Sequence, residues 1–124
     1  MNVRIWVGLM LAIAPLAAAQ AMPVSTFLAK ADALKSKGAF ALFSGDLKLL
    51  TQQMKGDAAQ LKAENQAAAA AGRRKAYCAP AGGFKLSNQE VVAAMQAVPA
   101  AQRASTDTKD AFRAYFARRF PCPA

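Results

Sequence analysis

Few residues in this chain of 124 could carry out chemistry. It contains no histidine, so a Ser-His-Asp or Cys-His catalytic group cannot be built, and the commonest zinc ligand is missing. Its seven acidic residues can serve as helix caps and surface charges, and no glycine-rich phosphate loop or calcium-loop pattern occurs. We therefore expect no enzyme activity, no catalytic residue, no cofactor and no metal site. A small hydrolase with two converging carboxylates is the remaining enzymatic alternative.

The N-terminal residues indicate export. Arg4 precedes an apolar run that Pro15 interrupts, and the small residues Ala19 and Ala21 fit the pattern that signal peptidase cleaves. The run is shorter than the roughly 20 apolar residues of a spanning helix, which disfavours the alternative of a membrane anchor. We predict a secretory signal peptide over residues 1–21, with cleavage after Ala21 or, alternatively, after Ala19. The mature protein is then periplasmic or secreted.

If the protein is exported, its two cysteines, Cys78 and Cys122, are expected to have a structural role. An oxidising compartment favours a stable disulfide, and neither cysteine belongs to the Cys-x-x-Cys arrangement of redox enzymes. Closing the loop of about 45 residues between them contributes roughly 4 kcal/mol in the chain-entropy model. We predict one intramolecular disulfide, with free thiols or an intermolecular bridge as the alternatives.

The chain is strongly basic. Its formal net charge is +9, from 16 lysines and arginines against seven acidic residues, and loss of Arg4 with the signal peptide lowers this charge by one. An exported protein meets anionic lipids, cell-wall carboxylates and acidic proteins rather than nucleic acid. We therefore expect no nucleic-acid partner, while peripheral contact with the membrane or the cell wall stays open.

Two basic clusters each end a few residues before a cysteine. They are Arg73, Arg74 and Lys75 in the first cluster, and Arg118 and Arg119 in the second. Because disulfide-bonded Cα atoms lie about 5 to 6 Å apart, the bond would bring both clusters to one end of the domain. These five residues are a candidate patch for carboxylates or phosphates of a partner. The alternative is solvated charge, with the two C-terminal arginines serving only the helix dipole.

The elements that must hold these residues are helices. After Met22 the apolar residues recur every three or four positions, and no sustained heptads or internal repeats occur. Caps and breakers delimit helices from Ser25 to Gly38, from Ser44 to about Glu64, from Ser87 to Pro99, and from Ser105–Asp107 to Pro121. Ser87 and Glu90 have the spacing of a capping box. We predict a single all-α domain over residues 22–124, a small bundle of about four helices stapled by one disulfide.

Three segments carry expectations about burial. The aromatic stripe from Phe112 to Phe120 has the spacing of a core face rather than of a ligand site. The connector Ala39–Phe43 is apolar and is expected to be a buried helical turn. The segment 66–76 is rich in alanine and has no large side chain to bury, so a flexible linker or a solvated helix end is expected there.

The second half of the chain resembles a known family. The sequence "YCAP", a capped helix "SNQEVVAAMQAVP" and a final helix ending "FARRFPC" look like the C-terminal half of the Rap/Tai-type immunity proteins. The resemblance covers about Tyr77 to Cys122, and the residues before it give no match to the family's toxin-contacting region. It implies an α-helical, disulfide-containing periplasmic protein, often dimeric, that binds a cell-wall amidase toxin and occludes its active site. The motif positions that carry over all have structural roles: Tyr77, Cys78, Pro80, Phe120, Pro121 and Cys122.

These observations lead to a functional prediction and to an alternative from another class. We expect an exported binding protein that neutralises a secreted peptidoglycan hydrolase by stoichiometric occlusion, and the resemblance adds a homodimer as an expectation. The alternative is a periplasmic envelope-associated or chaperone-like protein whose basic surface binds anionic lipid, peptidoglycan or client proteins.

Overall fold

The computed structural model describes residues 21–124, and the predicted signal peptide, except for its last residue, lies outside the described residues. The described chain forms four α-helices and two short 3-10 helices: α1 (Val24–Lys37), η1 (Gly38–Phe43), α2 (Gly45–Ala70), α3 (Asn88–Gln96), η2 (Ala100–Gln102) and α4 (Thr108–Arg119). No strand forms in this part of the chain, although one isolated antiparallel bridge joins Pro23 to Asp107. The predicted all-α bundle is confirmed.

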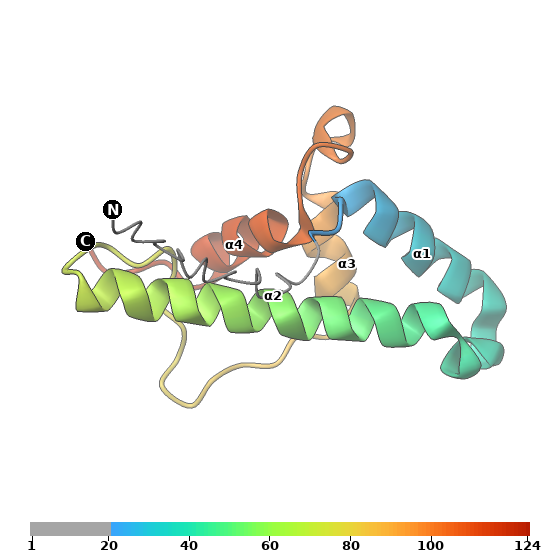
Figure 1. Cartoon of the computed structure of the whole chain (residues 1–124), viewed down its shortest axis with the longest axis horizontal. Coiled ribbons are helices and arrows are strands. Elements are labelled where there is room, and N and C mark those ends of the chain that lie inside the picture. Colours follow the sequence, from blue (N-terminus) through green and yellow to red (C-terminus); the bar gives the residue numbers. More distant parts are fainter. Residues whose placement is uncertain (1–20) are drawn as a thin grey trace, which may run out of the picture.

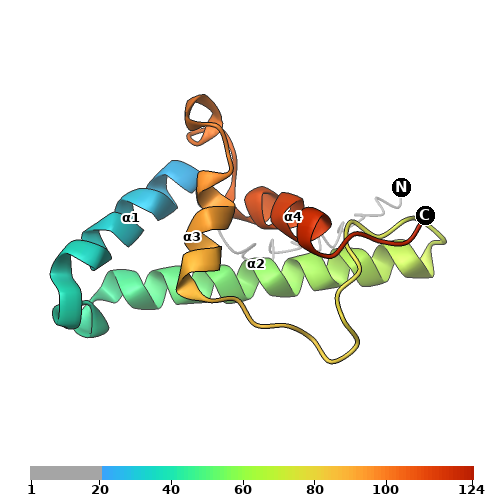
Figure 2. The ribbon, with the colours of Figure 1, turned by 180° about the vertical axis from the view of Figure 1, so that it is seen from behind.

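The long helix α2 sets the length of the molecule (Figure 1). Its 26 residues span about 39 Å at a rise of 1.5 Å per residue. Helices α1 and α4 pack against opposite halves of α2, and α3 packs against both α1 and α4. The irregular segment 71–87 loops out beside α2 before α3 begins (Figure 2). None of the helices within residues 21–124 has the length and apolar character needed to cross a bilayer.

Several helix termini form where the sequence predicts them. Gly38 has a φ of 54°, a conformation that favours glycine, and it ends α1. Ser44 caps α2, because its Oγ accepts the N–H of Asp46 at 3.2 Å. Ser87 and Glu90 form the predicted capping box, in which each side chain accepts the backbone N–H of the other residue.

The start of α1 differs from the prediction. The helix begins at Val24 and has no side-chain cap, although Ser25 was expected to provide one. The N–H groups of Val24 and Ser25 donate instead to the carbonyls of Thr106 and Arg103, at 2.8 and 3.0 Å. The backbone before α4 therefore takes the place of a hydroxyl cap, and it ties the start of α1 to a distant part of the chain.

The aromatic stripe of α4 lies in the core, as predicted. Phe112 and Phe116 are buried. Tyr115 and Phe120 are partly exposed and pack against the core. The ring centroid of Phe116 lies 5.1 Å from those of both Tyr77 and Phe84. The loop that leaves α2 therefore contributes two aromatic side chains to the same cluster, which fixes its path beside the helix.

A buried polar contact joins α2 to α4. Asp57 is 3% exposed and Thr108 is fully buried. The Thr108 hydroxyl donates to Asp57 Oδ2 at 2.6 Å, and Gln53 Nε2 donates to the other carboxylate oxygen at 3.0 Å. Burial raises the pKa of Asp57 above its ordinary value, although both hydrogen bonds act in the opposite direction. The two donors allow a carboxylate to sit between the helices.

The alanine-rich segment 66–76 is helical as far as Ala70 and then turns at Gly72, which has a φ of 69°. Both polar atoms of the Asn65 side-chain amide hydrogen-bond to the backbone of the returning chain. Its Nδ2 donates to the carbonyl of Tyr77 at 2.8 Å, and its Oδ1 accepts the N–H of Ala76 at 3.0 Å. These two bonds fix where the chain turns back along α2.

The connector Ala39–Phe43 is helical as expected, but the expectation that it is buried is wrong. It forms η1 at the outer end of the molecule, where α1 and α2 meet (Figure 1). Phe40, Leu42 and Phe43 are 78%, 76% and 88% exposed. The reason is geometric, because the turn at Gly38 carries η1 beyond the α1–α2 pair and the described chain places nothing over it.

Candidate binding surfaces

The predicted disulfide is formed. Cys78 and Cys122 are bonded, and their Cα atoms lie 4.9 Å apart across a sequence separation of 44 residues. The N–H of Cys78 also donates to the carbonyl of Phe120 at 2.8 Å. The segment after α2 is therefore held against the segment after α4 by one covalent bond and one hydrogen bond.

The disulfide brings the two basic clusters to one end of the molecule, but their side chains are divided among different surfaces. Lys75 lines a large groove beside α2, while Arg118 lines a smaller hollow of about 250 Å³ against the end of α3. Arg119 forms an ion pair with Glu90 and lies 5.1 Å from the ring centroid of Phe120. The remaining two arginines are exposed and line neither hollow. That these five residues bind a partner stays a prediction.

Most carboxylates of residues 21–124 are engaged within the molecule. Those with a side-chain partner are Asp46, Asp57, Glu64, Glu90 and Asp110. Hydrogen bonds from Arg113 and Lys109 lower the pKa of Glu64, and the backbone N–H of Ser87 is the main cause of the lowered pKa of Glu90. No group of acidic or cysteine side chains in this part of the chain could hold a metal ion. Lys30, Lys109, Arg113 and Arg119 are the basic residues that form ion pairs within residues 21–124, so most of the positive charge there is not compensated by a neighbouring carboxylate.

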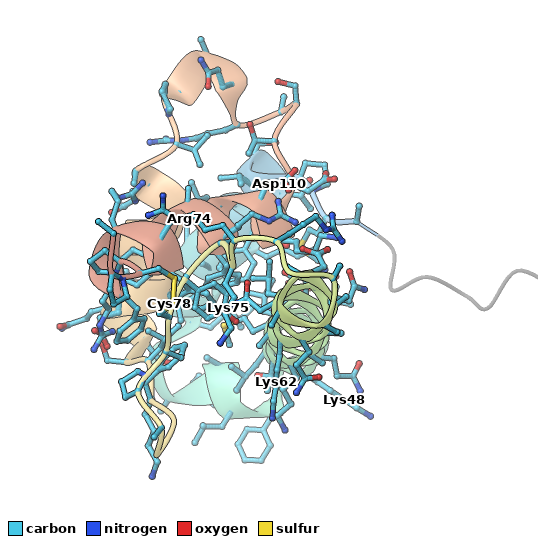
Figure 3. All side chains as sticks on the ribbon, turned by 90° about the vertical axis from the view of Figure 1, so that its left-hand side faces the viewer. Lys48, Lys62, Arg74, Lys75, Cys78 and Asp110 are labelled. Carbon is cyan, nitrogen blue, oxygen red and sulfur yellow. A yellow bond between two sulfur atoms is a disulfide. The ribbon has the colours of Figure 1, made fainter. Side chains whose placement is uncertain are left out.

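One candidate surface is a groove between α2 and the returning loop, with a volume of about 950 Å³. We call it the lysine groove, because Lys55 and Lys62 from α2 and Lys75 from the loop are its charged lining residues. No aspartate or glutamate of the described chain lines it. In Figure 3, Lys75 extends from the loop into the space beside α2, whereas Lys48 projects from α2 away from it.

The lysine groove has an apolar floor and an extended outer wall. Met54, Phe112 and Phe116 contribute apolar atoms from α2 and α4. In the wall, Phe84 and Leu86 line the groove, while the intervening lysine is exposed and does not. This alternation is that of an extended chain. A turn closed by the N–H of Gly83 to the carbonyl of Pro80, at 2.9 Å, precedes the wall.

The second candidate surface is the apolar tip, which we define as Phe40, Leu42 and Phe43 in η1. Its base is well anchored. The ammonium group of Lys30 pairs with Asp46 at 3.0 Å, which joins α1 to α2 beneath η1. Large apolar side chains exposed together are uncommon on monomeric soluble proteins, so the tip is a candidate interaction site.

Lysines lie in the helices on both sides of the apolar tip. Lys35 and Lys37 lie in the last turn of α1, and Lys48 lies in the first turns of α2. Lys37 donates to Ser44 Oγ at 3.3 Å, directly after η1. None of these three lysines forms an ion pair within residues 21–124. The tip therefore combines an apolar centre with a basic margin.

Sequence reasoning missed both surfaces. The apolar composition of the tip residues predicts burial, and the sequence does not single out Lys55 or Lys62 among its basic residues. A weak signal for the groove exists, since two lysines seven positions apart lie on one helix face. That helix face becomes one side of a groove only because the loop runs beside it, and the disulfide and Asn65 fix the path of the loop.

Comparison of the chain with protein-family models, with curated proteins and with solved structures finds no match.

Proposed function

We propose that the protein is an exported binding protein that neutralises a cell-wall hydrolase by occluding its active site. The observation that carries this proposal is the apolar tip, where three large apolar side chains are each more than three-quarters exposed. Burying one such side chain contributes about 1.5–3 kcal/mol before the costs of association. A monomer gains nothing by exposing three together, so a partner that covers them explains their presence.

The position of the tip suits entry into a concave site. η1 projects at one end of an elongated molecule, and α1 and α2 support it from behind (Figure 1). An apolar centre with a charged margin is also the usual composition of a protein interface. We infer a partner cleft with apolar walls and carboxylates around its mouth, which the lysines at the margin would pair with. The resemblance of the second half to immunity proteins supports a hydrolase as the owner of that cleft.

The alternative function uses the same tip. Exposed aromatic side chains beside lysines also suit the interface of an anionic membrane, as in an envelope-associated protein. The two functions differ in what covers the tip, which is a folded cleft in the first and lipid headgroups and acyl chains in the second. A single pair of variants separates them.

The test is a titration of the mature protein against purified secreted peptidoglycan hydrolases from the same organism, with release of soluble cell-wall fragments as the readout. The wild-type protein should inhibit with an endpoint at a fixed stoichiometry. Replacing Phe40 and Phe43 by serine should weaken inhibition about a hundredfold, since two anchors of the interface are lost.

Leu49→Ser is the matched control, because Leu49 is 42% exposed but lies outside the tip. Its inhibition should equal that of the wild type. Absence of inhibition by the wild-type protein, together with binding to phosphatidylglycerol vesicles that the Phe40→Ser/Phe43→Ser variant loses, would replace the proposed function by the alternative. Equal inhibition by both variants would remove the tip from the interface.

A further inference from the structure

We infer that the lysine groove binds an extended, acidic segment of a protein partner. This inference concerns a different surface and a different ligand chemistry from those of the apolar tip, and it does not depend on the partner being a hydrolase. Four features of the groove support it: its charge, its length, its apolar floor and the unpaired backbone of its wall.

The charge of the groove is unbalanced. Lys55, Lys62 and Lys75 line it without any carboxylate among the lining residues. Glu64, which lies on the same helix, is engaged by Lys109 and Arg113 of α4 at 2.9 and 2.7 Å. Its charge is therefore already compensated, and it is not a lining residue. Three like charges along one groove favour a ligand that carries several negative charges.

The length of the groove fits a short stretch of extended chain. Its lining residues on α2 run from Met54 to Ala69, which corresponds to about 22 Å of helix. An extended chain advances about 3.3 Å per residue, so about six or seven residues fill this length. Lys55 and Lys62 are seven residues apart and lie about 10 Å from each other along the axis. Carboxylates on alternate residues of an extended ligand are about 7 Å apart, and the long, flexible lysine side chains would span the remaining difference.

The outer wall offers main-chain hydrogen bonds. Within the described chain, Phe84, Lys85 and Leu86 form no backbone hydrogen bond, although their side chains alternate as in a strand. An extended wall with unpaired N–H and C=O groups is what a peptide adds to when it binds as a strand. Because these groups lie perpendicular to the lining side chains of Phe84 and Leu86, such a peptide would lie beside the wall and direct alternate side chains toward the groove. The pairing would also give the ligand a direction and a register.

The floor decides between a peptide and other anions. The apolar atoms of Met54, Phe112 and Phe116 suit apolar side chains that alternate with the acidic ones. A single fatty-acid carboxylate would engage one of the three lysines and leave the others unmatched. A bilayer surface is too flat to reach a concave floor. The observations therefore favour a segment in which acidic and apolar residues alternate.

The test uses a fluorescent heptapeptide in which glutamate alternates with leucine, blocked at both ends, with the mature disulfide-bonded protein at low ionic strength. Fluorescence anisotropy should show saturable binding. A peptide with glutamine in place of glutamate should bind about tenfold more weakly or worse, because each charge-assisted contact is lost. Replacing Lys55 and Lys62 by glutamate should weaken binding of the acidic peptide by a similar factor or more.

The matched control replaces Lys35 and Lys48 by glutamate, which changes the net charge equally at two exposed positions that neither line the groove nor belong to its wall. At an ionic strength that screens distant charges, about 0.15 M, the control variant should bind the acidic peptide within about twofold of the wild type. Circular dichroism establishes that both variants are folded.

The inference would be overturned if the wild-type protein showed no saturable binding, or if both double variants weakened binding equally. It would also be overturned by a third outcome, in which phosphatidylglycerol vesicles displace the peptide and Lys55→Glu/Lys62→Glu is the only variant that no longer binds vesicles. The last outcome would assign the groove to lipid. Because the assay contains no hydrolase, and because Lys55→Glu/Lys62→Glu leaves the tip and its margin unchanged, failure of this test is separate from failure of the proposed function.

Discussion

At the scale of single residues, the contact between Asp57 and Thr108 is the most informative, because Asp57 is the only buried carboxylate within residues 21–124. Its pKa is raised by burial, so the folded state holds the proton to a higher pH than the unfolded chain does. The contribution of Asp57 to the free energy of unfolding is then largest below its ordinary pKa of 3.8. It falls as the pH rises from there through the raised pKa.

We predict that Asp57→Asn removes this pH dependence. The asparagine keeps two hydrogen-bonding partners, because its oxygen can accept from Thr108 while the Gln53 amide turns to accept from its nitrogen. As the pH rises from about 4 to 7, the free energy of unfolding of the wild type should fall relative to that of the variant, because only the wild type has a carboxyl group to deprotonate at this position. Urea unfolding at several pH values measures the difference, and a difference that stays constant over this range would contradict the prediction.

Asp57→Leu is the contrasting variant. It leaves the buried Thr108 hydroxyl without its acceptor, and it should lower the free energy of unfolding by about 1–3 kcal/mol. The sequence could not have revealed this contact, since its partners are 51 residues apart. The capping box of Ser87 and Glu90 was predictable for the opposite reason, because its two members are three residues apart.

At the scale of elements, Arg103 connects two of the helices. Its Nε donates to the carbonyl of Val98 at 2.9 Å and its Nη2 to that of Gln96 at 3.0 Å, so it satisfies the C-terminal end of α3. Its own carbonyl accepts the N–H of Ser25 at the start of α1. A single residue between η2 and α4 therefore holds two helix ends.

We predict that Arg103→Ala lowers the free energy of unfolding by about 1–2 kcal/mol, because two carbonyls lose their donors. Arg103→Lys should recover less than half of this loss, since an ammonium group cannot reproduce the two-pronged geometry of guanidinium. Amide hydrogen exchange should rise in the last turn of α3 in both variants. If the amide exchange rates in this turn are unchanged, water hydrogen-bonds to the two carbonyls as well as Arg103 does, and the prediction is wrong.

The elements also show what sequence periodicity can and cannot predict. The starts of α2 and α3 follow from Ser44 and Ser87, because a helix cap is decided by a few adjacent residues. Their ends do not, since α2 runs on to Ala70 and α3 stops at Gln96. The exposure of η1 does not follow, since an apolar segment is buried only if another element lies over it. The lysine groove escaped prediction for a similar reason, as its outer wall is a loop whose path depends on contacts with Asn65 and Phe116.

At the scale of the whole molecule, the disulfide fixes the end of the domain that contains the groove. We predict that replacing Cys78 and Cys122 by serine lowers the free energy of unfolding by roughly 4 kcal/mol, the value expected for a closed loop of about 45 residues. Urea unfolding of the variant and of the reduced wild-type protein should coincide. A loss below about 1 kcal/mol in both would show that the reduced, unfolded chain already keeps the two segments together.

The bridge between Pro23 and Asp107 constrains the order in which the molecule can be completed. Ribosomes release a chain from its N-terminus, so α1 is made long before the residues at 103–108 that receive it. Until those residues appear, the apolar side chains of Val24 and Phe27, which are buried in the finished protein, face solvent. The newly synthesised chain therefore exposes these two side chains until residues 103–108 have been made and can pack against the start of α1.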